Sequence, residues 1–211
     1  MKTPFTADQF FDVFKNYNET VYPIQIILFV LGLFTIFYAI RPVSNSNTII
    51  SLSLGFLWIW MGIVYHYMFF AVINKAAYAF SVIFVLQGIL FLFMGIFQNK
   101  LSFIFRNSIY GYSGLIMIIY AMVIYPVIGY FLGHTYPYSP NFGLPCPTTI
   151  FTFGMLLWMD RKCSVILWII PFIWLVIGFF AALNFGMWED TGLMIAGLIA
   201  IPMILIKNKS F

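Results

Sequence analysis

The sequence predicts an all-α fold: a polytopic transmembrane bundle of seven helices, with the N-terminus outside, the C-terminus inside and a short N-terminal interfacial helix. Three observations support this class. Apolar residues make up 63% of the 211 residues and charged residues only 8%, whereas soluble domains carry about 25% charged residues. The apolar residues form long continuous runs, and Lys and Arg gather at alternate ends of these runs. Lipid is therefore the expected solvent.

Seven apolar runs approach the length of a membrane span, for which a helix needs about 20 residues. They are uniformly apolar rather than alternating, which argues against a barrel. Helices satisfy every backbone polar group within their own segment. The predicted spans are Tyr22–Ile40, Thr48–Ile73, Ala77–Phe97, Ser108–Gly133, Pro147–Met159, Ser164–Asn184 and Thr191–Ile206. We expect a transmembrane domain over residues 21–206, after an N-terminal helix in residues 1–20 and before a cytoplasmic tail of residues 207–211.

The charges predict the orientation. Seven of the ten basic residues follow the first, third, fifth or seventh run: Arg41, Lys100, Arg106, Arg161, Lys162, Lys207 and Lys209. On that side Asp160 is the one acidic residue. The other side holds three basic and five acidic residues: Lys2, Lys15, Lys75, Asp8, Asp12, Glu19, Glu189 and Asp190. Because an excess of Lys and Arg marks the cytoplasmic side, the N-terminus is expected outside and the C-terminus inside.

The first 20 residues predict a short amphipathic helix. They contain no apolar core of a cleavable signal peptide. Thr6-Ala7-Asp8-Gln9 has the pattern of a capping box, and Phe10, Phe11 and Phe14 share one side of the helix that follows. This stripe predicts a helix lying on the outer membrane surface, and packing of the stripe against the protein core is the alternative.

The fifth run is too short for a full crossing. Its 13 residues, Pro147–Met159, span only ~20 Å at 1.5 Å per residue. The preceding segment, residues 134–147, contains four prolines and cannot be helical. Irregular backbone at membrane depth must be buried or line a cavity, so we expect this segment to fold into the protein. The seventh run starts somewhat sunken too, and half-buried helix N-termini of this kind form ligand sites in transporters.

Rare polar side chains gather in the outer half of the predicted bundle. Both histidines, one of the two cysteines and five of the six acids lie there. Ionisable residues inside a membrane are expensive and mark functional sites. The ligand-binding candidates are His66, Gln87, His134, Cys146, Thr148, Thr149, Glu189 and Asp190. Gln87 is expected to form the floor of the site, and Gln25 is placed to reach it from the first run.

Several of these residues also have a structural interpretation. Asp190 is placed to cap the last helix, and Glu189 and His134 are alternatively solvated loop residues. His66 is alternatively a hydrogen-bonded core histidine. Cys146 is alternatively a small apolar side chain that fills space. If Cys146 is a functional thiol, its position at a helix N-terminus would favour the thiolate form. Its distance from Cys163, at the opposite end of the bundle, excludes a disulfide between the two.

Three chemistries fit this set, and none has a compact motif. His66, His134, Cys146 and Glu189 form a weak candidate set for a divalent metal such as zinc or copper; no cofactor is otherwise evident. A Cys–His pair would provide a nucleophile. A carboxylate and a histidine would move protons coupled to a solute. Scattered basic residues give no nucleic-acid patch, and P-loop, HExxH, GxSxG and CxxC motifs are absent from the sequence.

Four phrases carry a family resemblance over nearly the whole chain. They are Trp60-Met-Gly62-Ile-Val-Tyr65-His66, Ile73-Asn74-x-Ala76-Ala77 with Gln87-Gly88, Phe142-Gly143-Leu-Pro145-Cys146-Pro147-Thr148-Thr149-Ile-Phe151-Thr152-Phe-Gly154, and Glu189-Asp190. In these phrases the sequence resembles an uncharacterised family of bacterial polytopic membrane proteins, a domain of unknown function. The resemblance implies a bacterial inner-membrane location and no particular activity.

The sequence favours an inner-membrane protein that binds or transports a small solute or ion through a pocket open to the periplasm. The first alternative is a membrane-embedded metal- or thiol-dependent enzyme acting on a lipid or quinone-like substrate at the outer leaflet. The second is a structural subunit of a membrane complex. The expected partners are the lipid bilayer, a small ligand, and further copies or subunits in the membrane. Whether the chain is an enzyme stays open.

Overall fold

The computed structural model describes residues 4–211, apart from the side chains of Ala181 and Ala182. Lys2, predicted on the outer side, lies outside the described residues. Every regular element in the described part is a helix. The α-helices are α1 (Ala7–Val21), α2 (Ile24–Ile40), α3 (Ser46–Trp60), α4 (Ala77–Leu92), α5 (Ile109–Ile119), α6 (Tyr125–Phe131), α7 (Pro145–Leu157), α8 (Val165–Phe185) and α9 (Thr191–Lys207). The π-helical turns are η1 (Met61–Phe69), η3 (Phe93–Phe97) and η4 (Tyr120–Ile124); the 3₁₀ turns are η2 (Phe70–Val72), η5 (Trp188–Asp190) and η6 (Asn208–Ser210).

Each of the seven predicted apolar runs is helical, which confirms the all-α class. Five helices, counted with their π and 3₁₀ extensions, are long and apolar enough to cross a membrane: Ser46–Val72, Ala77–Phe97, Ile109–Phe131, Val165–Phe185 and Trp188–Ser210. A sixth is obtained if α1 and α2, which meet at 86°, are counted as one broken span. Helix α7 has only 13 residues. The number of helices that reach spanning length is thus smaller than the seven that the sequence predicts.

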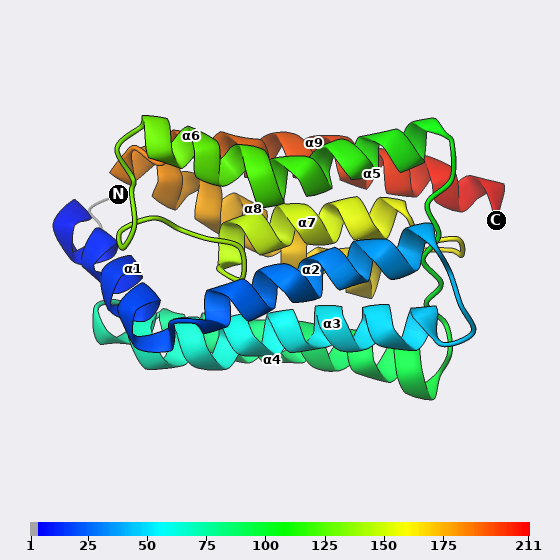
Figure 1. The fold of residues 1–211 in the computed structure, drawn as a ribbon, viewed down its shortest axis with the longest axis horizontal. Helices are drawn as coiled ribbons and strands as arrows, with labels where there is room; N and C mark the ends of the chain where they lie inside the picture. The colour runs from blue at the N-terminus through cyan, green and yellow to red at the C-terminus, as the bar shows by residue number, and fades with distance from the viewer. Residues whose placement is uncertain (1–3) are drawn as a thin grey trace.

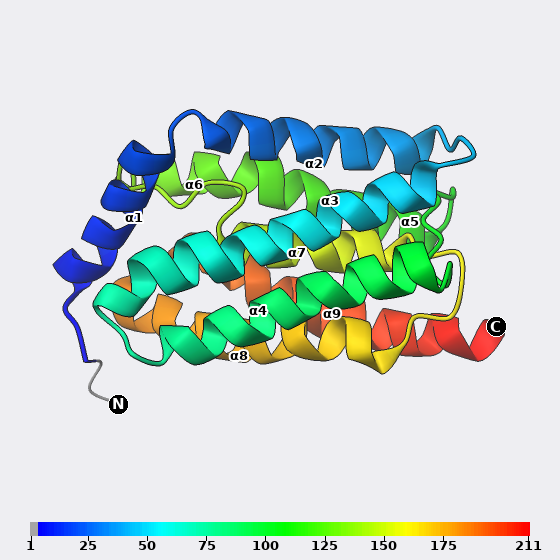
Figure 2. The ribbon, with the colours of Figure 1, turned by 90° about the horizontal axis from the view of Figure 1, so that it is seen from below.

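The helices α2 to α9 run side by side along the long axis of the molecule, and α1 crosses one end (Figures 1 and 2). Helix α7 lies in the middle of this bundle, between α2 and α5 in Figure 1. All of its residues except Cys146 are buried. A helix that is apolar all round is a buried helix, so the short fifth run is the central core element. The irregular segment before it folds onto the protein as expected, because Asn18 donates hydrogen bonds to the carbonyls of Pro137 and Ser139.

Helix α1 packs onto the bundle through its aromatic stripe. The predicted capping box is confirmed, since Thr6 and Gln9 each accept a hydrogen bond from the other's backbone. The rings of Phe10 and Phe14 are buried beside those of η1, η2 and the end of α8. This favours the core-packing interpretation of the stripe: α1 closes one end of the bundle, which we call the α1 end.

Close helix packing in the bundle depends on glycine. A Cβ atom on Gly88 of α4 would lie 2.6 Å from the carbonyl oxygen of Gly55 on α3. Gly114 of α5 and Gly154 of α7 face each other in the same way, with 2.7 Å from each added Cβ to the other's carbonyl oxygen. Small residues allow helix backbones this close in membrane bundles.

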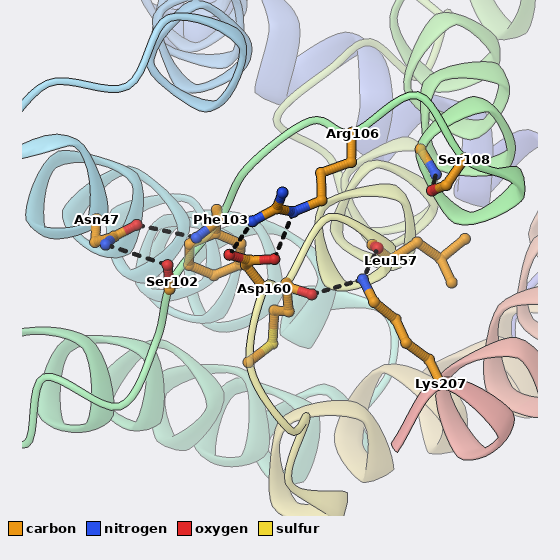
Figure 3. Close-up of polar contacts among 10 residues, drawn as sticks. Asn47, Ser102, Phe103, Arg106, Ser108, Leu157, Asp160 and Lys207 are labelled. Carbon is orange, nitrogen blue, oxygen red and sulfur yellow. Dashed lines mark hydrogen bonds and ion pairs between the residues drawn. The ribbon is translucent and has the colours of Figure 1, made fainter. Parts of the chain in front are cut away.

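The opposite end of the bundle carries the C-terminus and the loops after α2, α4 and α7 (Figure 1). These are the segments that hold the seven basic residues singled out above. Figure 3 shows how side chains tie the segments together. Lys207 donates to the carbonyls of Leu157 and Met159 at the end of α7, at 2.9 and 2.6 Å. Arg106 forms a bidentate ion pair with Asp160, with both N–O distances 2.7 Å. We call this the basic end.

Candidate functional site

A cavity of about 440 Å³ lies at the α1 end. It is formed by the N-terminal segment and α1, by η1 and η2, by α4 and α6, by the start of α7, and by the second half of α8 with η5. Ten aromatic side chains line it: Phe5, Phe10, Phe14, Tyr65, Phe70, Phe80, Tyr125, Trp174, Phe180 and Phe185. The remaining lining residues include Asn74, Cys146, Ile177, Gly178, Asn184 and Asp190. Among the described residues of the lining, Asp190 is the one with a charged side chain.

Asp190 is held in the cavity wall by two other lining residues. The Tyr125 hydroxyl donates a hydrogen bond to Asp190 Oδ1 at 2.5 Å. The Cys146 thiol lies next to the same carboxylate. Asp190 occupies the cap position of α9, as the sequence predicts, but its side chain makes no capping hydrogen bond. The capping interpretation is therefore wrong for the side chain, whose Oδ1 accepts the hydrogen bond from Tyr125 instead.

Glu189 and His134 form a second pair beside this cavity. His134 Nδ1 lies 2.7 Å from Glu189 Oε1, and the Tyr120 hydroxyl donates to the Glu189 backbone carbonyl at 2.7 Å. The Glu189 side chain is 0% exposed and that of His134 is 14% exposed. The alternative of a solvated loop residue is therefore wrong for Glu189, whereas His134 is only partly buried. Asp8, Asp12 and His134 border a separate open hollow, so His134 connects buried Glu189 to the surface.

His66 lies behind the cavity wall and not in it. Its side chain is fully buried, and neither ring nitrogen has a hydrogen-bond partner in the described part of the chain. Aromatic rings surround it, with Phe84 at 4.5 Å and Trp174 at 5.0 Å between ring centroids. His66 forms no hydrogen bond or ion pair with the other predicted site residues. His66 is therefore a candidate residue that does not line the cavity, because its face of η1 points to α4 and α8.

Three of the amide and hydroxyl residues considered above, Gln87, Gln25 and Thr148, form structural hydrogen bonds. Gln87 Nε2 donates to the Leu167 carbonyl at 3.0 Å and thereby joins α4 to α8. Gln25 does not reach it, since Gln25 Nε2 donates to the Asn18 carbonyl. Thr148 Oγ1 accepts from the Gly143 backbone N–H at 3.0 Å, which fastens the segment before α7. Thr149 is buried with no partner for its hydroxyl among the described residues. None of these four lines the cavity.

The proposed metal set is not assembled. Within the described residues, no three His, Cys, Asp or Glu side chains are placed to hold a metal ion. Of the four predicted ligands, the structure pairs His134 with Glu189, whereas Cys146 contacts Asp190 and His66 stands apart. Both cysteines are free, as predicted. Asp190 puts a carboxylate next to the Cys146 sulfur, and no Cys–His hydrogen bond occurs in residues 4–211, so the geometry does not assemble a thiolate–histidine pair.

Sequence reasoning missed the residues that make this cavity distinctive. Tyr125 and Trp174 lie inside apolar runs, where they were not distinguished from other aromatic residues. A signal was present for Tyr125, because a tyrosine hydroxyl buried in a span needs a partner and the nearest candidates are the rare acids. For Trp174 no such signal existed, since its role depends on which face of α8 is turned inward.

The fold and the cavity define an all-helical bundle in which five apolar helices have membrane-spanning length. The chain belongs to a family of unknown function, DUF6064, whose profile matches residues 7–211. This confirms the resemblance of the sequence to a family of unknown function. Neither the curated proteins nor the solved structures gave a match to this chain.

Proposed function

We propose that this chain is a bacterial inner-membrane protein that binds a small, largely apolar molecule in the cavity at its α1 end. The observation that carries the proposal is the cavity itself, about 440 Å³ in volume, with an aromatic lining and with polar atoms of Tyr125, Cys146 and Asp190 in its wall. Ligand sites have volumes of roughly 300–1,000 Å³, apolar walls and a few placed polar groups. Binding of this kind serves as the first step of either transport or sensing.

The rim of the cavity supports access from the lipid or the membrane interface. Phe180 lines the cavity and is 60% exposed. It continues a stripe of exposed α8 residues at seven-residue spacing, Ile166, Ile173 and Phe180, which is the surface that a spanning helix turns to lipid. Pro4 and Asn184 are the other exposed lining residues. A molecule dissolved in the outer leaflet would therefore meet the rim directly.

The charge distribution supports a topology with the α1 end at the periplasm. Seven of the ten basic residues lie at the basic end, and an excess of Lys and Arg marks the cytoplasmic side. In this topology α2 and α7 complete a seven-helix bundle, with α7 shielded from lipid by its neighbours. Cysteines introduced at Ser44 and Tyr136, in a chain lacking Cys146 and Cys163, test it. An impermeant maleimide applied to intact spheroplasts should label only Tyr136→Cys; labelling of Ser44→Cys alone would reverse the topology.

Binding is tested with the neutral fluorescent probe N-phenyl-1-naphthylamine and the protein in lipid nanodiscs. Saturable fluorescence above that of protein-free nanodiscs is the expected result. Ile177→Trp, which fills the cavity, should remove the saturable component. The matched control is Ile173→Trp, one helical turn away on the exposed stripe of α8, which should retain it. No saturable binding in the wild type, or equal binding in both variants, would remove the basis of the proposal.

A further inference from the structure

We infer that the cavity selects an organic cation: a lipophilic amine or quaternary ammonium compound whose charged nitrogen meets Asp190 and whose apolar part packs among the aromatic rings. This inference rests on the proposed binding function and names the class of its ligand. It follows from three features of the described residues: an acidic group without a cationic partner, the aromatic rings in the wall, and a lining without basic residues.

The Asp190 carboxylate is buried without a cation. The side chain is in the cavity lining, and the residue is 3% exposed. Within the described residues Arg106 pairs with Asp160, and His134 Nδ1 lies 2.7 Å from Glu189 Oε1, so His134 engages the neighbouring acid and not Asp190. Buried charges in proteins are normally paired, and here the missing positive charge would be supplied by the ligand.

Two features of the surroundings of Asp190 oppose the cost of burying a negative charge there. The Tyr125 hydroxyl donates a hydrogen bond to its carboxylate, beside which the Cys146 thiol lies, and donors to an ionised carboxylate stabilise that form. Asp190 also precedes the first turn of the 17-residue helix α9, whose N-terminus carries the positive end of the helix dipole. The carboxylate is thus held in place by groups that bring no full positive charge.

The rings in the wall provide the second half of a cation site. Phe10 and Phe14 of α1 have centroids 4.9 Å apart, and Phe14 stacks on Tyr65 at 6.1 Å. Tyr65 stacks in turn on Phe70 at 5.8 Å. A cation near ring faces is attracted by the ring quadrupole, and quaternary ammonium groups are recognised in this way. The same rings give the apolar part of a ligand its contacts.

A preference for a cation over a neutral molecule of the same shape distinguishes this inference from a purely apolar cavity. Moving a cation out of water is costly, so an apolar cavity without a carboxylate prefers a neutral molecule of the same shape. A carboxylate in the wall reverses that order and rejects an anion. The three cases are compared with 4-phenylbutyltrimethylammonium, its neutral carbon isostere (5,5-dimethylhexyl)benzene, and the anion 5-phenylpentanoate.

Binding of each probe is measured in lipid nanodiscs, with Kd expressed as probe concentration in the lipid so that partitioning cancels. In the wild type the cation should bind more tightly than the neutral isostere, and the anion should bind most weakly. Asp190→Asn should lower the ratio of neutral to cation Kd by about tenfold or more, the effect of losing a desolvated charge partner. The matched control Asp160→Asn, at the basic end, should leave this ratio unchanged.

Equal or tighter binding of the neutral isostere by the wild type would overturn the inference, as would an unchanged ratio in Asp190→Asn. The order of the three probes on the wild type decides the question even if Asp190→Asn fails to fold. Failure of the proposed function has a different signature: none of the probes would bind saturably, and Ile177→Trp would change nothing. If the wild type binds the neutral isostere at least as tightly as the cation, and Ile177→Trp abolishes that binding, the proposed function is kept and the inference of a cationic ligand is rejected.

Discussion

The hydrogen bond from Tyr125 to Asp190 should be a measurable part of the stability of the bundle. Tyr125 is 1% exposed and Asp190 3% exposed, and their oxygens are 2.5 Å apart. Tyr125→Phe removes the donor and leaves the ring volume unchanged, so no cavity opens. A hydrogen bond to a charged group contributes about 1.5–3 kcal/mol. We therefore expect the free energy of unfolding to fall by about 2 kcal/mol, or the melting temperature by roughly 4–8 °C for a chain of this size.

Denaturant titration of the protein in bicelles, followed by tryptophan fluorescence, measures this difference. Tyr112→Phe is the matched control, because Tyr112 is 53% exposed and its hydroxyl makes one long contact with Asn107, at 3.4 Å. Its removal should cost less than about 0.5 kcal/mol. In an Asp190→Ala background Tyr125→Phe should also become nearly neutral, since the acceptor is gone. The reasoning is refuted if Tyr125→Phe and Tyr112→Phe have the same effect, or if the loss persists without Asp190.

Three further predictions concern packing, the second buried pair and the surface ion pair. Gly88→Val should destabilise the bundle by about 1–3 kcal/mol, the usual cost of overpacking, measured by the same titration; stability equal to wild type would contradict the close approach of α3 and α4. His134→Ala should cost about 3 kcal/mol because it strands the buried Glu189 carboxylate, and adding Glu189→Gln should restore most of it. A double variant no more stable than the single one would show that charge burial is not the cause. The Arg106 guanidinium, hydrogen-bonded to Asp160, lowers the pKa of that carboxyl, so the stabilisation is present above the ordinary carboxyl pKa and is lost as pH falls through the lowered value. Arg106→Gln should move the pKa of Asp160 back up in an NMR titration, and an unchanged pKa would refute the pairing.

The features that the sequence predicted well are local or one-dimensional. Apolar runs have to be helical in any solvent that cannot bind backbone groups, so all seven were found. The capping box of Thr6 and Gln9 involves residues three apart, and its pattern is sufficient to predict it. The inward fold of the segment before Pro147 followed from its prolines and from the short helix after it. The alternation of basic residues predicted which loops share one end.

The candidate site was predicted in part, for a physical reason. His134, Cys146, Glu189 and Asp190 do meet at the α1 end, since depth along a helix can be estimated from the sequence. His66 lies at a comparable depth but belongs to another set of contacts. The direction in which the His66 side chain points is set by the rotation of α3 and η1 about their axis. A nearly uniform apolar run gives no amphipathic signal from which that rotation could be predicted.

The scarcity of charge, the apolar runs and the positions of Lys and Arg determine by themselves that this is a helical bundle suited to lipid, with a basic and an acidic end. Only the tertiary structure decided which rare polar groups meet. Asp190 is hydrogen-bonded to Tyr125, 65 residues earlier in the chain, and Glu189 contacts His134, 55 residues earlier. Which polar side chains meet depends on the rotation of each packed helix about its own axis and on its tilt. Both are set by packing contacts such as those of Gly88 and of the buried helix α7. Long-range packing, and not local pattern, therefore turned a scattered set of polar residues into an aromatic cavity with one acidic group.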